Sequence, residues 1–412
     1  AESSIIGGVD ISPEVLRETA KNIQHIQDIE KLMIEALEGN KVHKVSHLLE
    51  IILAGAIAIK ASDIHIEPEQ NRGRLRIRLD GVLQDINFFG LDIYRLLNSR
   101  IKLLSGVKLT SKIAQDGRFS IMEGKDEINI RTSLIPGAYG ESIVMRILDP
   151  KSIQVKLEEL GIEPYLFSII GEEIAKPNGL ILVTGPTGSG KTTTLYAFLR
   201  KIYSSEIKII TIEDPIEYHL AGITQTQTNE EKGYTFVEGL RSALRQDPDV
   251  VMVGEIRDRE TAEIAVQSAL TGHIVFSTLH TNNAAGVIPR LIDLGVNPKI
   301  LVSALSLSIA QRLVRKLCQF CKKENIPTEK EAKIIKIVLD SLKEEGKDFA
   351  KYNIKSDTSL KIFSPVGCEK CNKIGYAGRI GIFEAIKTDE ALEKIMPENP
   401  SEHEIKKVAR NQ

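Results

Sequence analysis

One glycine-rich loop constrains the fold more than any other feature of this sequence. It follows the apolar run GLILVT, which ends at Thr184, and leads into a segment of helical character. Its pattern, G-x-x-x-x-G-K-[ST], is typical of a phosphate-binding loop between a strand and a helix, because glycines let backbone N–H groups surround phosphate oxygens. Lys191 would contact the terminal phosphates, and Thr192 would hold magnesium. We expect the phosphates to be bound by Gly185, Pro186, Thr187, Gly188, Ser189, Gly190, Lys191, Thr192 and Thr193.

The chain around this loop alternates between strands and helices. Four short apolar runs, within GLILVTG, IKIITIEDP, DVVMVGEI and HIVFSTLH, are separated by helical patterns that begin near residues 190, 236 and 259. Apolar strands separated by helices are typical of a mainly parallel sheet that is buried on both faces. We therefore predict an α/β fold with a P-loop core at residues 157–300.

The part before the core has a different pattern. We predict a helical segment or linker at residues 1–44, with one helix at 12–38 that Ser12 caps, and a small α+β domain at residues 45–150. Apolar residues alternate with arginines in RGRLRIRLDGVLQDI, and the turn Asp80-Gly81 follows, which predicts a β-hairpin. The other predicted elements of this domain are helices at 45–59 and 92–105 and strands at 117–122, 127–133 and 142–148.

The last part, residues 301–412, carries all four cysteines. We predict that it is mostly helical, with a lysine- and glutamate-rich insert at 322–361. The cysteines form two C-x-x-C pairs, Cys318 with Cys321 and Cys368 with Cys371. Four thiolates at this spacing suit tetrahedral zinc, with a redox pair as the alternative. Neither pair has the surroundings of a redox motif, so we predict a structural zinc subdomain at about residues 315–385.

Acidic side chains follow two predicted strands of the core. Gly254 follows the strand Asp249 to Val253, and the next residue is Glu255, a carboxylate that can polarise water or hold magnesium through water. An ordinary surface glutamate is the alternative. Glu213, Asp214 and Glu217 follow another strand and suggest organisation of magnesium and water, with a solvated loop as the alternative for Glu217.

Two histidines, His273 and His280, flank the strand IVFSTL. A lone histidine is more often a hydrogen-bonded structural residue than a catalyst. Thr278 and Thr281 favour a phosphate-sensing role at the end of this strand. By contrast, Asp63, His65 and Glu67 show the alternation of a half-buried strand, and this explains their spacing without a metal.

Charge and hydropathy exclude several classes of protein. Lys and Arg number 54 and Asp and Glu number 56, so the net charge of −2 gives no global attraction to nucleic acid. Few aromatic residues accompany the arginines, which argues against a surface for stacking bases. The longest strongly apolar stretch, at 48–59, contains Glu50 and is shorter than the about 20 residues that a bilayer requires. The first residues show no secretion signal, so we expect a cytoplasmic protein, and the missing initiator Met suggests a shortened chain.

Four blocks together resemble the secretion ATPase superfamily, the motors of type II secretion and type IV pilus assembly. They are SDIHIEP, GPTGSGKTTT, TIEDPIEY and GEIRDRETAEIAVQSALTGHIVFSTLHTN. The paired C-x-x-C motifs resemble the extension-type motor and its secretion counterpart, since the retraction motor lacks these cysteines. The resemblance implies a RecA-like core whose Walker A loop is 185–192 and whose Walker B strand ends at Gly254-Glu255. It further implies an Asp box with Glu213, Asp214 and Glu217, a His box with His273 and His280, and terminal-phosphate contacts from Arg131 and Arg146.

The resemblance also implies a function. We expect a hexameric ATPase that uses ATP and Mg²⁺, carries Zn²⁺, and powers pilin or pseudopilin polymerisation. Its partners would be further copies of itself and an inner-membrane platform protein, with which it would associate peripherally from the cytoplasm. No nucleic-acid partner is expected. A nucleic-acid translocase and a nucleotide-gated scaffold are the rival functions, and the sequence does not separate secretion from pilus assembly.

Overall fold

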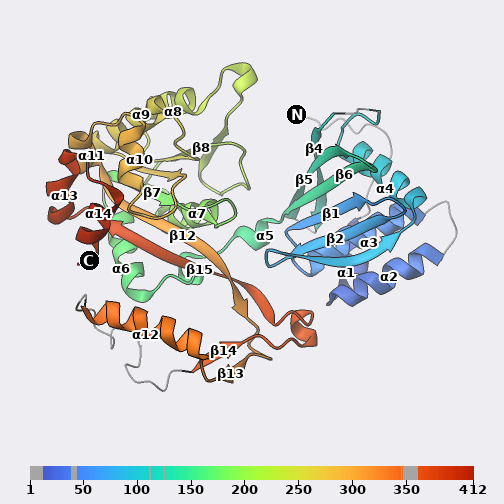
Figure 1. The fold of residues 1–412 in the computed structure, drawn as a ribbon. Coiled ribbons are helices and arrows are strands. Elements are labelled where there is room, and N and C mark those ends of the chain that lie inside the picture. Colours follow the sequence, from blue (N-terminus) through green and yellow to red (C-terminus); the bar gives the residue numbers. More distant parts are fainter. Residues whose placement is uncertain (1–12, 39–43, 111–112, 124–125, 345, 347–360) are drawn as a thin grey trace. The chain divides into compact units, whose positions relative to one another are not determined.

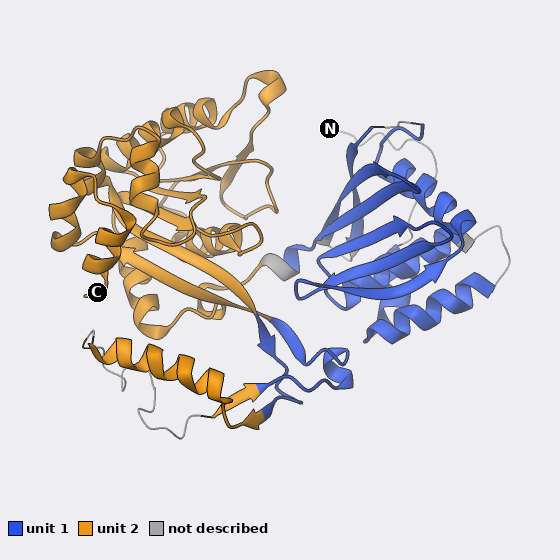
Figure 2. Ribbon diagram, in the orientation of Figure 1, with its two compact units in different colours: residues 1–153, 315–323, 364–378 blue, residues 154–314, 324–363, 379–412 orange. Residues whose placement is uncertain are grey.

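The computed structural model describes residues 13–38, 44–110, 113–123, 126–344, 346 and 361–412 (Figure 1). The chain divides into two compact units (Figure 2). Unit 1 comprises residues 1–153, 315–323 and 364–378, and unit 2 comprises residues 154–314, 324–363 and 379–412. The cysteine segments thus belong to the same unit as the N-terminal domain, although most of the chain between them belongs to unit 2.

The main element of unit 1 is a six-stranded antiparallel sheet in the order β3-β2-β1-β6-β5-β4, with helices over one face (Figure 1). Leu75, Ile77 and Leu79 of β2 are buried, whereas the arginines between them are half-buried on the other face. The predicted hairpin is confirmed, since β2 pairs with β3 and both turn residues, Asp80 and Gly81, have positive φ. The strands are β1 (Asp63–Pro68), β2 (Gly73–Leu79), β3 (Val82–Phe89), β4 (Gln115–Glu123), β5 (Asp126–Gly137) and β6 (Gly140–Leu148).

The helices of unit 1 differ from the prediction at one place. They are α1 (Pro13–Lys21), α2 (Ile26–Glu38), α3 (Lys44–Ala58), α4 (Leu91–Leu104) and α5 (Pro150–Ile153). The single helix predicted at 12–38 is therefore wrong, because the chain breaks between α1 and α2. The Asp28 carboxylate stabilises the break by accepting hydrogen bonds from the N–H groups of Gln24 and His25, at 2.9 and 2.8 Å. Ser12, the predicted cap, lies outside the described residues.

Unit 2 contains a seven-stranded sheet in the order β15-β12-β7-β11-β10-β8-β9. The pairs from β12 to β9 are parallel, and every residue of β7, β8, β10 and β11 is buried, which confirms the predicted α/β core. The strands are β7 (Gly179–Thr184), β8 (Ile209–Glu213), β9 (Thr224–Gln227), β10 (Val250–Val253), β11 (Ile274–Leu279), β12 (Leu305–Leu317) and β15 (Tyr376–Lys387). The helices before residue 300 are α6 (Pro164–Ile174), α7 (Lys191–Ile202), α8 (Phe236–Leu244), α9 (Arg259–Leu270), α10 (Val287–Asp293) and α11 (Pro298–Ala304), with short 3₁₀ turns at Leu157–Glu159 and Glu230–Lys232.

The prediction that the chain is mostly helical after residue 300 needs correction. Two long strands, β12 and β15, extend the core sheet in this region. The sequence gives little sign of β12, because its first half is buried almost without alternation and its second half is mostly exposed. The remaining elements are β13 (Lys323–Asn325), α12 (Glu329–Glu344), β14 (Ile362–Ser364), α13 (Glu390–Ile395) and α14 (Glu402–Ala409), with 3₁₀ turns at Glu369–Cys371 and Met396–Glu398.

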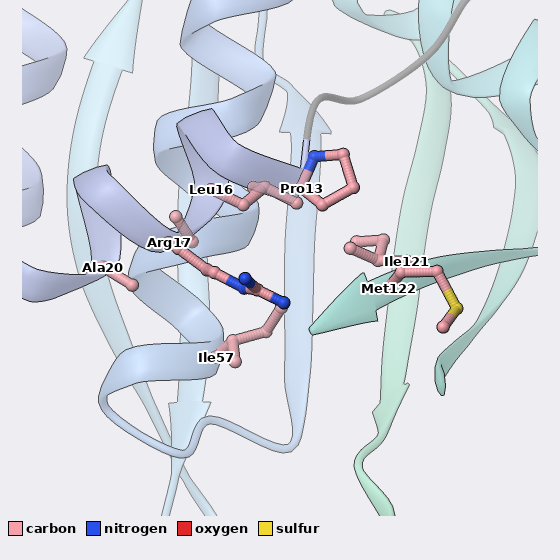
Figure 3. A pocket seen from close by; sticks show the side chains of 8 residues that line it. Pro13, Leu16, Arg17, Ala20, Ile57, Ile121 and Met122 are labelled. Atoms are coloured by element: carbon pink, nitrogen blue, oxygen red, sulfur yellow. The ribbon is translucent and has the colours of Figure 1, made fainter. Parts of the chain in front are cut away.

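A small pocket lies in unit 1 among α1, α3 and β4 (Figure 3). The side chain of Arg17 extends toward Ile121 and Met122. The cavity of about 10 Å³ has room for a single water molecule, so it is a packing gap and offers no ligand site. Among the described residues, no helix combines the length and the apolar character needed to cross a bilayer.

Candidate functional site

The glycine-rich loop connects the end of β7 to the start of α7. Gly188 and Gly190 have φ values of 76° and 87°, a conformation that residues with a Cβ rarely adopt. A Cβ added to Gly185 would lie 2.4 Å from the carbonyl oxygen of Gln311, so this position has no space for a side chain. The sequence thus needs glycine at these positions to form the loop at all.

Lys191 is the first residue of α7, and its side chain folds back over the loop. Its Nζ donates hydrogen bonds to the carbonyl oxygens of Gly185 and Pro186, at 2.9 and 3.3 Å. Desolvation lowers the pKa of Lys191, against the opposing charge of Glu255. Phosphate oxygens are stronger partners for an ammonium than neutral carbonyls, so Lys191 can exchange these contacts for a phosphate.

Glu255 follows β10 at the same edge of the sheet, because the carboxyl ends of parallel strands meet there. One carboxylate oxygen pairs with Arg257, and the other lies 3.2 Å from Nε2 of His280, which follows β11. The hydrogen bond with Glu255 raises the pKa of Arg257, and the charge of Asp214 adds to the effect. The structure therefore brings Glu255 and His280 together, and Arg257 is a partner that the sequence analysis missed.

Threonine hydroxyls hold the strand ends in place. The Thr184 hydroxyl donates to the carbonyl oxygen of Leu279 at 2.7 Å and accepts from the N–H of Thr281 at 2.8 Å. Thr278 donates to the carbonyl oxygen of Gly254 at 2.7 Å. These bonds fix residues 278–281, on both sides of His280, against the P-loop strand and the strand that precedes Glu255. His273, by contrast, precedes β11 at the opposite edge, where its Nδ1 lies 3.0 Å from the carbonyl oxygen of Ser268.

Glu213 lies at the end of β8 and is almost fully buried. Its carboxylate accepts hydrogen bonds from Tyr196 of α7, from Thr211 at 2.5 Å and from Gln225 at 3.0 Å. Burial raises the pKa of Glu213, although these donors oppose the rise. The network connects α7, the helix after the P-loop, to β8 and β9. Glu213 therefore stabilises the packing of α7 against these strands.

Arg131 and Arg146 lie on unit 1, on adjacent strands β5 and β6. They are direct register partners, and Arg118 of β4 is the partner of Arg131 on its other side. Directly opposite residues share one face of an antiparallel sheet, so the three arginines form a row. Asp63, of the SDIHIEP block, follows Arg146 in this row and accepts a hydrogen bond from its Nε at 2.9 Å. On its other side Asp63 is the register partner of Arg78, whose Nε lies 3.4 Å from the second carboxylate oxygen of Asp63. The sequence analysis missed Arg118, which the pairing of β4 with β5 would have revealed.

The four cysteines lie close together in unit 1. Their sulfur atoms are all within 4.8 Å of one another, and the separations include 3.9 Å for Cys318–Cys368 and 3.7 Å for Cys321–Cys371. Zn–S bonds of about 2.3 Å in a tetrahedron place sulfurs about 3.8 Å apart, so the cluster fits zinc. Burial opposes ionisation of Cys371, but N–H donors from Cys368 and Gly375 outweigh it and lower the pKa of this thiol to about 7.

The comparisons with known proteins agree with one another. A family model described as "Type II/IV secretion system protein" matches residues 38–412. Type II secretion system protein E of Aeromonas hydrophila is 44% identical over 378 residues, which are 92% of this chain and 72% of that protein. The type IV pilus assembly ATPase PilB of Myxococcus xanthus is 39% identical over 407 residues, which are 98% of this chain and 68% of that protein.

Solved structures also resemble this chain. The pilus retraction motor PilT with bound ADP is 27% identical, with a TM-score of 0.55, over 84% of this chain and 85% of that chain. The ATPase DotB of Legionella pneumophila superposes with a TM-score of 0.60 over 88% of this chain and 86% of that chain. At 23% identity, DotB supports the fold alone.

The first prediction concerns the pH dependence of stability at Glu213. A raised pKa in the folded chain means that Glu213 contributes stability below its ordinary pKa of 4.5 and loses it as pH rises through the raised value. Glutamine does not titrate. The free energy of unfolding of the wild type minus that of Glu213→Gln, measured in urea titrations, should therefore fall as the pH rises above 4.5. Exposed Glu231→Gln is the control, and a difference that stays constant or grows would contradict the prediction.

The second prediction concerns zinc. The double variant Cys318→Ser, Cys371→Ser should lose the metal, and its Tm should fall by at least about 5 °C, because structural zinc contributes directly to folding. The variant should lose less free energy of ADP binding than free energy of unfolding, since the cysteines are outside the P-loop. Elemental analysis and thermal unfolding are the measurements. A chelator should lower the Tm of the wild type and leave that of the variant unchanged. Elemental analysis that finds no zinc in the purified wild type would refute the assignment.

Proposed function

Since this chain belongs to the type II/IV secretion system protein family, we propose that it is the motor that powers pilin or pseudopilin polymerisation. It is an ATPase, as its relatives are, and its core has the fold of PilT and DotB. The proposal extends this activity to a homohexameric ring that converts ATP hydrolysis into subunit movement. The relatives' names include both type II secretion and type IV pilus assembly, so the proposal covers both cargos.

The observation that carries the proposal is the convergence of Lys191 and Glu255 on one edge of the core sheet. We assign residues 185–193 to the phosphates of ATP, with Lys191 on the terminal ones. We assign Glu255 to the activation of the attacking water, because a carboxylate there can accept a proton. Arg257 and His280 would orient this carboxylate through the contacts described above.

Two metal ions belong to the proposal. Thr192 follows Lys191 in α7 and would hold Mg²⁺, which supplies charge neutralisation between the phosphates when bound. The four cysteines would hold Zn²⁺ as a structural ion. Glu213 enters as a residue that positions α7 and β8 through Tyr196, rather than as a group on the phosphate.

Arg131 and Arg146 would meet the charge that develops on the terminal phosphate. An arginine in this role can accelerate phosphoryl transfer by about 10³ to 10⁵. Their placement on unit 1 supports a coupling of chemistry to movement, because unit 1 would respond to the state of a nucleotide bound to unit 2. Either the same chain or a neighbouring copy in the ring could supply them.

The remaining parts of the proposal concern partners. We propose an inner-membrane platform protein as the direct partner and a peripheral position on the cytoplasmic side of that membrane. A net charge of −2 gives no reason to expect nucleic acid, and an ATPase rate that DNA or RNA raises severalfold would favour a translocase instead.

The test of the proposed chemistry is Glu255→Gln. The amide keeps the shape of the side chain but cannot accept a proton, so ATP should still bind while turnover falls by at least about a hundredfold. Phosphate release and nucleotide binding by the purified chain measure the two effects, with exposed Glu231→Gln as the control. A loss of affinity as large as the loss of rate would instead make Glu255 a magnesium ligand.

The arginines are tested by Arg131→Ala and Arg146→Ala. Each should lower turnover by orders of magnitude and leave ATP affinity within about tenfold, since the arginines act on the transition state. Arg95→Ala, an exposed position in the same unit, is the control. Mixing Arg131→Ala with Lys191→Ala subunits then identifies the donor: recovery of activity means that a neighbour supplies the arginine, and no recovery means that the same chain does. Wild-type turnover in both single variants would exclude the role.

A further inference from the structure

Gln311 of β12 contacts the P-loop through its side-chain amide. Its side chain is only 3% exposed, and both ends of the amide are used. Nε2 donates a hydrogen bond to the carbonyl oxygen of Ser189 at 2.5 Å, and Oε1 accepts one from the Thr194 hydroxyl at 2.7 Å. One side chain thus joins the end of the loop to the first turn of α7.

The position of this amide follows from the sheet. Ala310 is paired with Thr184, the last residue of β7, so Gln311 comes next to the first glycine of the loop. A Cβ on Gly185 would lie 2.4 Å from the carbonyl oxygen of Gln311, and a Cβ on Gly190 would lie 3.1 Å from its Nε2. The P-loop therefore packs against Gln311 at both of its ends.

The hydrogen bond to Ser189 fixes the direction of a peptide group. In a trans peptide, the carbonyl of Ser189 and the N–H of Gly190 point to opposite sides of the chain. A carbonyl held by Gln311 therefore directs the Gly190 N–H away from Gln311. P-loops bind phosphate through such N–H groups, so a rotated peptide would remove one donor and present an oxygen to an anion.

We propose that Gln311 is a positioning residue of the phosphate site: it holds the Ser189–Gly190 peptide and the start of α7 in the orientation that binds phosphates. This inference rests on the proposed function, because it assumes that the loop binds the phosphates of a nucleotide. Glutamine suits the task because it offers a donor and an acceptor on one planar group. Neither glutamate nor methionine can replace both bonds.

The experiment measures ADP·Mg²⁺ affinity by calorimetry on the full chain. Gln311→Glu, which places a carboxylate against the Ser189 carbonyl, should weaken ADP binding at least about tenfold, and Gln311→Met about threefold or more. Thr194→Val should also weaken ADP binding. The effects of Gln311→Met and Thr194→Val should be less than additive in the double variant, because each removes the same Gln311–Thr194 bond. Gln246→Glu, at an exposed glutamine after the end of α8, should bind ADP as the wild type does.

The outcomes separate this inference from the proposed function. A wild type that fails to bind ADP refutes the proposed function itself. If the wild type binds ADP and a folded Gln311→Glu variant binds ADP with an affinity within twofold of the wild type, the role of Gln311 is overturned and the proposed function is not. A purely structural role would lower the unfolding temperature of the nucleotide-free variants without changing ADP affinity, and this result also overturns the inference. Where Gln311→Glu does not fold, unchanged affinity in Thr194→Val and Gln311→Met decides against it.

Discussion

The backbone of the loop between β7 and α7 is the constraint on which the rest of the core depends. Its glycines adopt conformations that side chains would forbid, and they allow N–H groups to converge on an anion. The start of the loop is fixed by β7, which lies between β11 and β12 in parallel register. The parallel pairing of β11 with β7, and of β10 with β11, brings His280 and Glu255 to the same end of the sheet as the loop, because each follows the carboxyl end of its strand.

Charge is compensated in both units by specific pairs. Glu255 lies between Arg257 and His280, and Lys191 is held by loop carbonyls. In unit 1, Asp63 pairs with Arg146, which orders one end of an arginine row. Such pairing keeps these groups oriented and offsets the cost of their burial, which at Lys191 is large enough to lower its pKa. A phosphate bound at the loop would compete with the Gly185 carbonyl oxygen for Lys191, so binding would move this side chain.

The sequence predicted the features that depend on local spacing. The P-loop, the Asp80-Gly81 hairpin, the strand–helix alternation and the two cysteine pairs are all encoded within short segments. It did not predict β12 and β15, because their burial depends on neighbours far away in the chain. The contacts of Tyr196 and Gln311 were missed for the same reason. Arg257 lies only two residues from Glu255, and the sequence analysis missed this local pair as well. Spacing placed Glu213 near the phosphates, but its side chain turns into the buried network with Tyr196, which only the packing of α7 on β8 reveals. His273 precedes its strand and therefore lies at the opposite edge from His280.

The most direct test of the account is ATP turnover by the purified chain with Lys191 replaced by alanine. The account holds that this ammonium stabilises charge on the terminal phosphates, a contribution that loop backbone alone does not supply. Phosphate release with Mg²⁺ and ATP should fall at least about a hundredfold in Lys191→Ala, whereas Lys201→Ala, at an exposed position on the same helix, should keep the wild-type rate. Hydrolysis by Lys191→Ala at a near-normal rate would contradict the account.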